Sequence, residues 1–313
     1  MIGDLMIQGA QMALVLLLAP LLTGFVRKVK ARLLRRQGAS LLQPYRDLLR
    51  LLRKEAVVAD NASWLFRTAP YLIFAATWVA AALIPTFAIN LKFSWTADLI
   101  AIVALLASAR FFLALAGMDI GTSFGGIGSS REVMIASLAE PAMIMIVFVL
   151  ALVAGATQLS TIAQFMLSPE VGLRVSLGLA LIALIIVAIA ENGRIPVDNP
   201  ATHLELTMVH EAMVLETSAR DLAWVELGSW LRLAVLLGLV GNLVAPWGVA
   251  TVLTPGAVLV GGVAVAVKVL VLAAVLGAAE VPMAKLRLFR VPELLAGSFL
   301  LAFLAVTASY LVA

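Results

Sequence analysis

The chain has 313 residues, of which 63% are hydrophobic and 13% are charged, and its mean hydropathy is +1.08. These values exclude a water-soluble globule of this size, because too few charged side chains are available to cover its surface. The net charge of +4 does not indicate nucleic-acid binding, since 10 of the 22 Lys and Arg residues lie in the loop directly after the first apolar run, where they set membrane orientation.

The chain has no cysteine, and its only histidines are His203 and His210. It therefore lacks thiolates for an iron–sulfur cluster or a nickel site, and it lacks the usual haem ligand pairs. We expect no cofactor in this chain, so any redox centre belongs to a partner.

About eight apolar runs are long enough to cross ~30 Å of hydrocarbon, which predicts an all-α, polytopic membrane protein with a single domain over residues 1–313. In chain order the predicted spans are Leu5–Val26, Trp64–Phe87, Trp95–Gly117, Glu132–Gly155, Gly172–Ala190, Val225–Trp247, Val252–Leu276 and Pro292–Val312.

Basic residues concentrate in alternate loops, of which the first, over residues 27–63, is the richest. The positive-inside rule therefore makes loops 27–63, 118–131, 191–224 and 277–291 cytoplasmic and places both termini on the outer side.

Within the first loop, leucines and one tyrosine recur at helical spacing opposite basic residues that include Arg46. This pattern predicts an amphipathic helix on the cytoplasmic surface. Lipid anchoring and docking of a soluble partner explain this helix equally well. Its apolar positions are Leu41, Leu42, Tyr45, Leu48, Leu49 and Leu52.

Five ionisable residues lie in or beside predicted spans, where each costs roughly 2.5 to 3.5 kcal/mol on insertion. Buried carboxylates and an amine can pass protons along bridging waters, so the set predicts a proton relay. The alternative is purely structural: Arg131 pairs with Glu132, Lys268 pairs with a buried acid, and the charges only fix helix register. The five residues are Asp119, Glu132, Glu140, Glu191 and Lys268.

After Glu191 the chain carries Pro196 and Pro200, which prevent a continuous helix, and Asp198 or Asn199 can cap a new helix. That helix would place His203 and His210 on a shared face near Glu205 and Glu211. We expect no metal site, because two histidines without the metalloprotease spacing do not complete a ligand set.

The segment 117–128 is rich in glycine, but it lacks the strand, lysine and spacing of a phosphate-binding loop. We therefore expect its glycines to permit tight turns beside packed helices.

Three blocks resemble the respiratory NADH dehydrogenase subunit 1 family, the quinone-chamber subunit of complex I. The first runs from Arg35-Arg36 through Lys54-Glu55, with Ala39 where the family usually has proline. The second runs from Gly117-Met-Asp119 through Ser130-Arg131-Glu132 to Glu140-Pro141, and the third is Glu191-Asn-Gly-Arg-Ile-Pro-Val-Asp198. The second block is similar to the membrane-anchor subunits of group 4 membrane-bound NiFe hydrogenases, of the formate hydrogenlyase and hydrogenase-4 type. The run from Thr202 to Glu211 resembles energy-converting hydrogenases and their archaeal relatives.

The resemblance implies a prokaryotic cell (inner) membrane subunit of an oxidoreductase complex that couples electron transfer to proton or sodium translocation. It implies hydrogenase large and small subunits, an iron–sulfur ferredoxin-like subunit and antiporter-like membrane subunits as partners, which would hold the NiFe centre and iron–sulfur clusters. The ion path implied by the resemblance is Glu140, Glu191, Asp198, Glu205 and Glu211. We add three of the ionisable residues found in or beside the predicted spans: Asp119, Glu132 and Lys268. Arg35, Arg36 and Arg194 would face the redox arm, and we add Arg46 and Arg131 to that predicted interface.

Three alternatives stay open. A quinone-using relative of complex I predicts an apolar lateral chamber beside Glu191. A secondary transporter is disfavoured because the chain has no detectable repeats or paired broken spans. A passive anchor predicts acids that only stabilise packing.

Overall fold

The computed structural model describes residues 2–84, 96–168, 174–199, 208–250 and 254–312. All of its long elements are α-helices, as predicted. Seven of them are long and apolar enough to cross a membrane. They are α1 Ile2–Leu33, α3 Trp64–Leu83, α4 Leu99–Asp119, α5 Ser123–Ala154, α9 Ala219–Val244, α10 Pro255–Ala279 and α11 Val291–Val312.

The remaining predicted span corresponds to α7, Val175–Glu191, which has 17 residues. At 1.5 Å per residue it is about 25 Å long, slightly less than the hydrocarbon thickness. The chain is therefore an all-α, multi-pass membrane protein.

The prediction of a loop over residues 118–131 was wrong in part, because α5 begins at Ser123 and not at Glu132. Gly121, with φ +75°, makes the turn after α4, and the Thr122 hydroxyl then accepts a hydrogen bond from the Gly125 amide. A Cβ on Gly125 would lie 2.0 Å from the Gly117 carbonyl oxygen. The glycines thus allow two helices to approach closely, and this packing outweighs their low helix propensity.

Four shorter helical elements connect the spans: α2 Gln43–Leu52, α6 Leu159–Leu167, α8 His210–Val214 and the 3-10 turn η2 Leu288–Arg290. The surface helix predicted after the first span is confirmed as α2, whereas α6 was not predicted. The helix predicted after Asp198 falls largely on residues 200–207, which lie outside the described ranges.

Helix α2 packs against α1 and α9. Its Tyr45 hydroxyl donates a hydrogen bond to the Leu17 carbonyl, and burial raises the pKa of this hydroxyl. Leu48 contacts the main core, whereas Leu42 and Leu49 are exposed. The face of α2 that points away from the bundle therefore exposes apolar side chains, which either lipid or a partner protein could cover.

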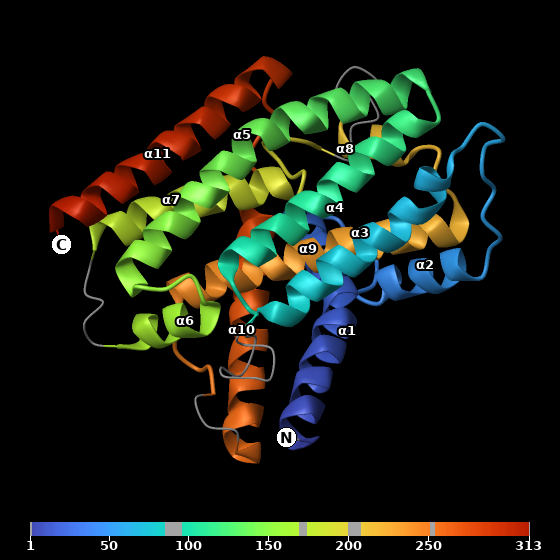
Figure 1. Ribbon diagram of the computed structural model, residues 1–313. Helices are drawn as coiled ribbons and strands as arrows, with labels where there is room; N and C mark the ends of the chain where they lie inside the picture. Colours follow the sequence, from blue (N-terminus) through green and yellow to red (C-terminus); the bar gives the residue numbers. More distant parts are fainter. Residues whose placement is uncertain (1, 85–95, 169–173, 200–207, 251–253, 313) are drawn as a thin grey trace.

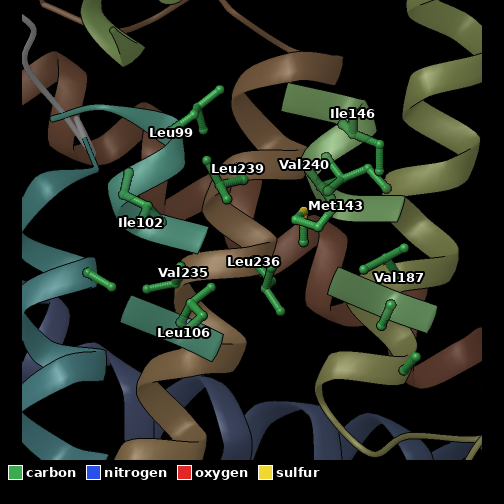
Figure 2. Close-up of a cluster of buried hydrophobic side chains, with 14 of the residues drawn as sticks. Leu99, Ile102, Leu106, Met143, Ile146, Val187, Val235, Leu236, Leu239 and Val240 are labelled. Atoms are coloured by element: carbon green, nitrogen blue, oxygen red, sulfur yellow. The ribbon is translucent and has the colours of Figure 1, made fainter. Parts of the chain in front are cut away.

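Helix α9 is the centre of the bundle. In its apolar 18-residue stretch 67% of the residues are buried, compared with 17% in the corresponding stretch of α10 and 22% in that of α11. Figure 2 shows Leu236 and Leu239 of α9 between Ile102 of α4 and Met143 of α5. In lipid these side chains gain little from leaving water, so close van der Waals packing between them holds the central helices together.

Other helices surround this centre: α3 packs against α4 and α9, and α11 packs against α5 and α7. Helices α1 and α10 pack against each other and against α9, and their N-terminal ends extend beyond the rest of the bundle in Figure 1.

Candidate functional site: a buried charge cluster beside a polar cavity

The centre of the candidate site is Arg110, in the middle of α4, with only 1% of its side chain exposed. Its Nε donates to Glu132 Oε1 of α5 at 2.7 Å, and its Nη1 donates to Glu191 Oε1 at the end of α7. From α9, Arg232 donates through Nη1 to the Glu191 carbonyl at 3.2 Å. Four spans therefore contribute to a single charge cluster, defined here as Arg110, Glu132, Glu191 and Arg232.

The cluster leaves some hydrogen-bonding capacity unused. Among the described residues, Arg110 Nη2, Glu191 Oε2 and Arg232 Nε are buried without a hydrogen-bond partner. Buried polar groups of this kind are usually satisfied by water. These three atoms are therefore available to hydrogen-bond water beside the cluster.

A cavity of about 200 Å³ adjoins the cluster. Charged side chains from α1, α5, α7, α9 and the following loops line it, so that it can hold water and ions. Its ionisable lining residues are Arg27, Lys30, Glu132, Glu191, Arg194, Asp198, His210, Glu211, Glu226, Arg232 and Glu280.

Ion pairs join the loops around this cavity. Glu280, just after α10, accepts from Arg194 Nη1 at 3.0 Å and from Lys30 Nζ at 2.8 Å. Asp198 accepts from Lys285 Nζ at 2.6 Å and from the His210 amide at 3.4 Å. These contacts tie the loop after α7 to α1, to α8 and to the loop after α10.

The structure brings together part of the predicted ion path, because Glu132, Glu191, Asp198 and Glu211 all line the cavity. Glu140 lies two turns further along α5, half-buried, and is not among the described lining residues. Glu205 falls outside the described ranges.

Two predicted path residues lie elsewhere. Asp119 accepts hydrogen bonds from the Ser63 amide at 2.8 Å and the Ser63 hydroxyl at 2.6 Å, at the start of α3. Lys268 lines a separate apolar cavity and has no hydrogen-bond partner among the residues described.

Two proposed pairings were wrong. Arg131 donates to the Met208 carbonyl at 2.8 Å, while Glu132 pairs with Arg110. The alternative in which Lys268 pairs with a buried acid also fails over the described part of the chain.

The five arginines predicted to face a redox arm differ in exposure. Arg35, Arg36 and Arg46 are exposed, whereas Arg131 and Arg194 are half-buried. The latter two bind Met208 and Glu280, so at least part of their role is internal.

Seven charged residues of the site were not predicted from the sequence: Arg27, Lys30, Arg110, Arg232, Glu226, Glu280 and Lys285. The signal for Arg110 and Arg232 was available, because each is a charge near the middle of a predicted span and carries the same insertion cost as the acids. By contrast, Glu280 and Lys285 lie in a loop, and nothing in their spacing indicates their partners.

Metal binding finds no support in the described ranges, where no group of three or more His, Asp or Glu side chains could hold an ion. His203 lies outside these ranges.

Comparison with known proteins gives full-length matches. Residues 7–311 match the family described as NADH dehydrogenase. The chain is 35% identical over 287 residues to formate hydrogenlyase subunit 4 of Escherichia coli (strain K12), covering 92% of each chain. It is 34% identical over 300 residues to hydrogenase-4 component C of the same organism, covering 95% of this chain and 93% of the relative.

A more distant relative is a subunit of the NADH-quinone oxidoreductase of Thermomicrobium roseum, 30% identical over 216 residues, or 59% of this chain and 61% of the relative. Among solved structures, a chain of the membrane-bound sulfane sulfur reductase, an archaeal respiratory membrane complex, matches with a TM-score of 0.77. The match covers 98% of this chain and 99% of that chain, and at 18% identity it concerns the fold alone.

Proposed function

The chain belongs to the NADH dehydrogenase family, as its three motif blocks predicted, and from this we propose that it couples electron transfer to ion translocation as the membrane subunit of an oxidoreductase complex. The chain itself contributes no redox centre. Its part is to convert a charge change beside the membrane into proton or sodium movement.

The observation that carries this proposal is the charge cluster at the wall of the polar cavity. A carboxylate in a desolvated site responds strongly to nearby charge. A charge change in a docked arm would therefore act on Glu191 and Glu132, which Arg110 links. The cavity supplies the polar route from the surface to that pair.

The names of the two relatives indicate which partner subunits to expect. We propose a hydrogenase-type arm with large and small subunits and an iron–sulfur ferredoxin-like subunit, together with antiporter-like membrane subunits. The NiFe centre and iron–sulfur clusters would belong to those partners. The arm would contact the exposed Arg35, Arg36 and Arg46, with both termini on the outer side of a prokaryotic membrane.

The test uses the whole complex in sealed inverted membrane vesicles. Glu191→Gln keeps the size and shape of the side chain and one acceptor oxygen for Arg110, but it removes the charge. We expect electron transfer to continue while ion transport per electron falls to a small fraction of the native ratio. The matched control is Glu293→Gln, which neutralises an acid at the start of α11, away from the cavity. An unchanged ratio for Glu191→Gln, and likewise for Glu140→Gln, would overturn the relay.

The quinone alternative receives less support. It predicts an apolar lateral chamber beside Glu191, whereas the cavity there is lined by charged side chains on several sides. The passive-anchor alternative predicts a different result: substitutions in the cluster would lower assembly of the complex but leave the ratio of ions to electrons unchanged.

A further inference from the structure

A second cavity, of about 100 Å³, lies between α1, α9 and α10. Leucines and valines make up most of its wall, including Leu14 and Leu18 of α1 and Val265 of α10. Among the described residues that line it, Lys268 is the one with an ionisable side chain. An amine in such surroundings is costly unless an anion accompanies it.

Lys268 has no such anion in the described part of this chain. Its Nζ is inaccessible to solvent and has no hydrogen-bond partner there. Other buried or half-buried cations have partners: Arg110, Arg194 and Lys285 contact a carboxylate, and Arg131 and Arg232 donate to a backbone carbonyl.

The depth of Lys268 restricts the kind of anion. It lies thirteen residues after the start of α10 and eleven before its end, about 20 Å and about 17 Å along the helix axis. Lipid phosphates lie at the membrane surface, beyond either end of the hydrocarbon layer. An anion at mid-depth therefore has to be carried on a protein segment that crosses the membrane.

The adjoining face of α10 is free for such a segment. Leu259, Val263, Val267 and Val271 are 71%, 59%, 55% and 56% exposed. Their four-residue spacing makes a continuous ridge of the kind that packs into the groove of another helix. Val271 is three residues from Lys268, so the ridge and the cavity share an edge.

We propose that this ridge and cavity receive a transmembrane helix of a neighbouring membrane subunit, and that an aspartate or glutamate on that helix pairs with Lys268. The inference rests on the proposed function, since it requires further membrane subunits in the complex. It adds where one of them binds and which charge it carries. The pair would also fix the register of the partner helix, because only one register brings its acid to the depth of Lys268.

The first experiment is photo-crosslinking in native membranes that contain the assembled complex. A photoreactive amino acid replaces Val267, and the control places it at Phe303 on the exposed face of α11. We expect Val267 to crosslink to a membrane-spanning peptide that contains Asp or Glu, and Phe303 not to yield that peptide. Adducts with lipid or quinone alone, or with a peptide that lacks an acid, would overturn the proposal.

The second experiment measures subunit retention after mild-detergent purification. Lys268→Met should lower recovery of the crosslinked subunit about tenfold or more, and Lys268→Arg should retain it. Exchanging the charges, with Lys268→Glu and lysine at the partner's acid, should restore recovery. Unchanged recovery in Lys268→Met would overturn the proposal.

Two further readouts separate the possible failures. Lys268→Met removes an unpaired buried charge, so the isolated subunit should be at least as heat-stable as the native one; a less stable subunit would contradict the absence of an internal partner. The ion-to-electron ratio of Glu191→Gln tests the proposed function independently of this interface.

Discussion

Arg110 and Glu132 form a buried ion pair between the middle of α4 and the first half of α5, with 2.7 Å between Nε and Oε1 and side-chain exposures of 1% and 13%. The same guanidinium contacts Glu191 of α7. One cation thus holds two acids from different helices at the wall of the polar cavity. Both stability and coupling should depend on it.

Replacing Arg110 with Met should leave two carboxylates without their cation. Breaking a buried pair costs about 3–5 kcal/mol, so the thermal midpoint and the membrane level of the assembled complex should fall. Arg220→Met, which removes an exposed arginine, is the control. Adding Glu132→Gln to Arg110→Met should recover part of the loss. No recovery would mean that the arginine stabilises the fold by packing alone.

Glu280 should hold the loop after α7 in place, because it accepts from both Arg194 and Lys30. Glu280→Gln weakens both contacts, and we expect a loss of about 1.5–3 kcal/mol, since hydrogen bonds to charged groups are worth this much. Trypsin cleavage after Arg194 in open membranes should become faster. Equal cleavage rates in Glu280→Gln and the control Glu293→Gln would contradict this role.

Asp119 should act as a structural residue, although the sequence placed it on the ion path. It binds the amide and hydroxyl of Ser63, whose Oγ accepts from the Leu65 amide to cap α3. Asp119→Ala should lower stability by about 1–3 kcal/mol, and Asp119→Asn should cost less. We expect the ion-to-electron ratio of Asp119→Asn to match the native ratio. A clear drop in that ratio would return Asp119 to the relay.

Neighbouring glycines at the start of α5 should respond in opposite directions to alanine. At Gly125 a Cβ would meet the Gly117 carbonyl oxygen at 2.0 Å, which would force α4 and α5 apart at a cost of about 1–3 kcal/mol. At Gly126 nothing lies within 4 Å, so alanine should gain up to ~1 kcal/mol from helix propensity. The thermal midpoints of the two variants in detergent provide the comparison, and similar midpoints would refute the close approach.

The start of α5 was mispredicted because its local sequence is typical of a loop. Three glycines and two serines lie between residues 124 and 130, yet Ser123–Ala154 is one helix. Glycine disfavours a helix only in the absence of packing, and here its missing side chain permits the contact with α4. Local propensity could not include that neighbour.

The surface helix after the first span was predictable, since its leucine spacing and opposing charges are local. The face it turns inward was not. Tyr45 and Leu48 contact the bundle, while Leu42 and Leu49, of the same predicted stripe, remain outside.

The sequence alone determined that this is an all-α membrane protein of the NADH dehydrogenase family with acids beside its spans, because apolar length and motif spacing are properties of contiguous residues. Only the tertiary structure decided which charges meet: Arg110 with Glu132 and Glu191, Glu280 with Arg194 and Lys30, and Lys268 with no anion in the described chain. The physical reason is that an ion pair acts over a few ångströms in space, whereas its partners here are separated by 22 to 250 positions in the sequence.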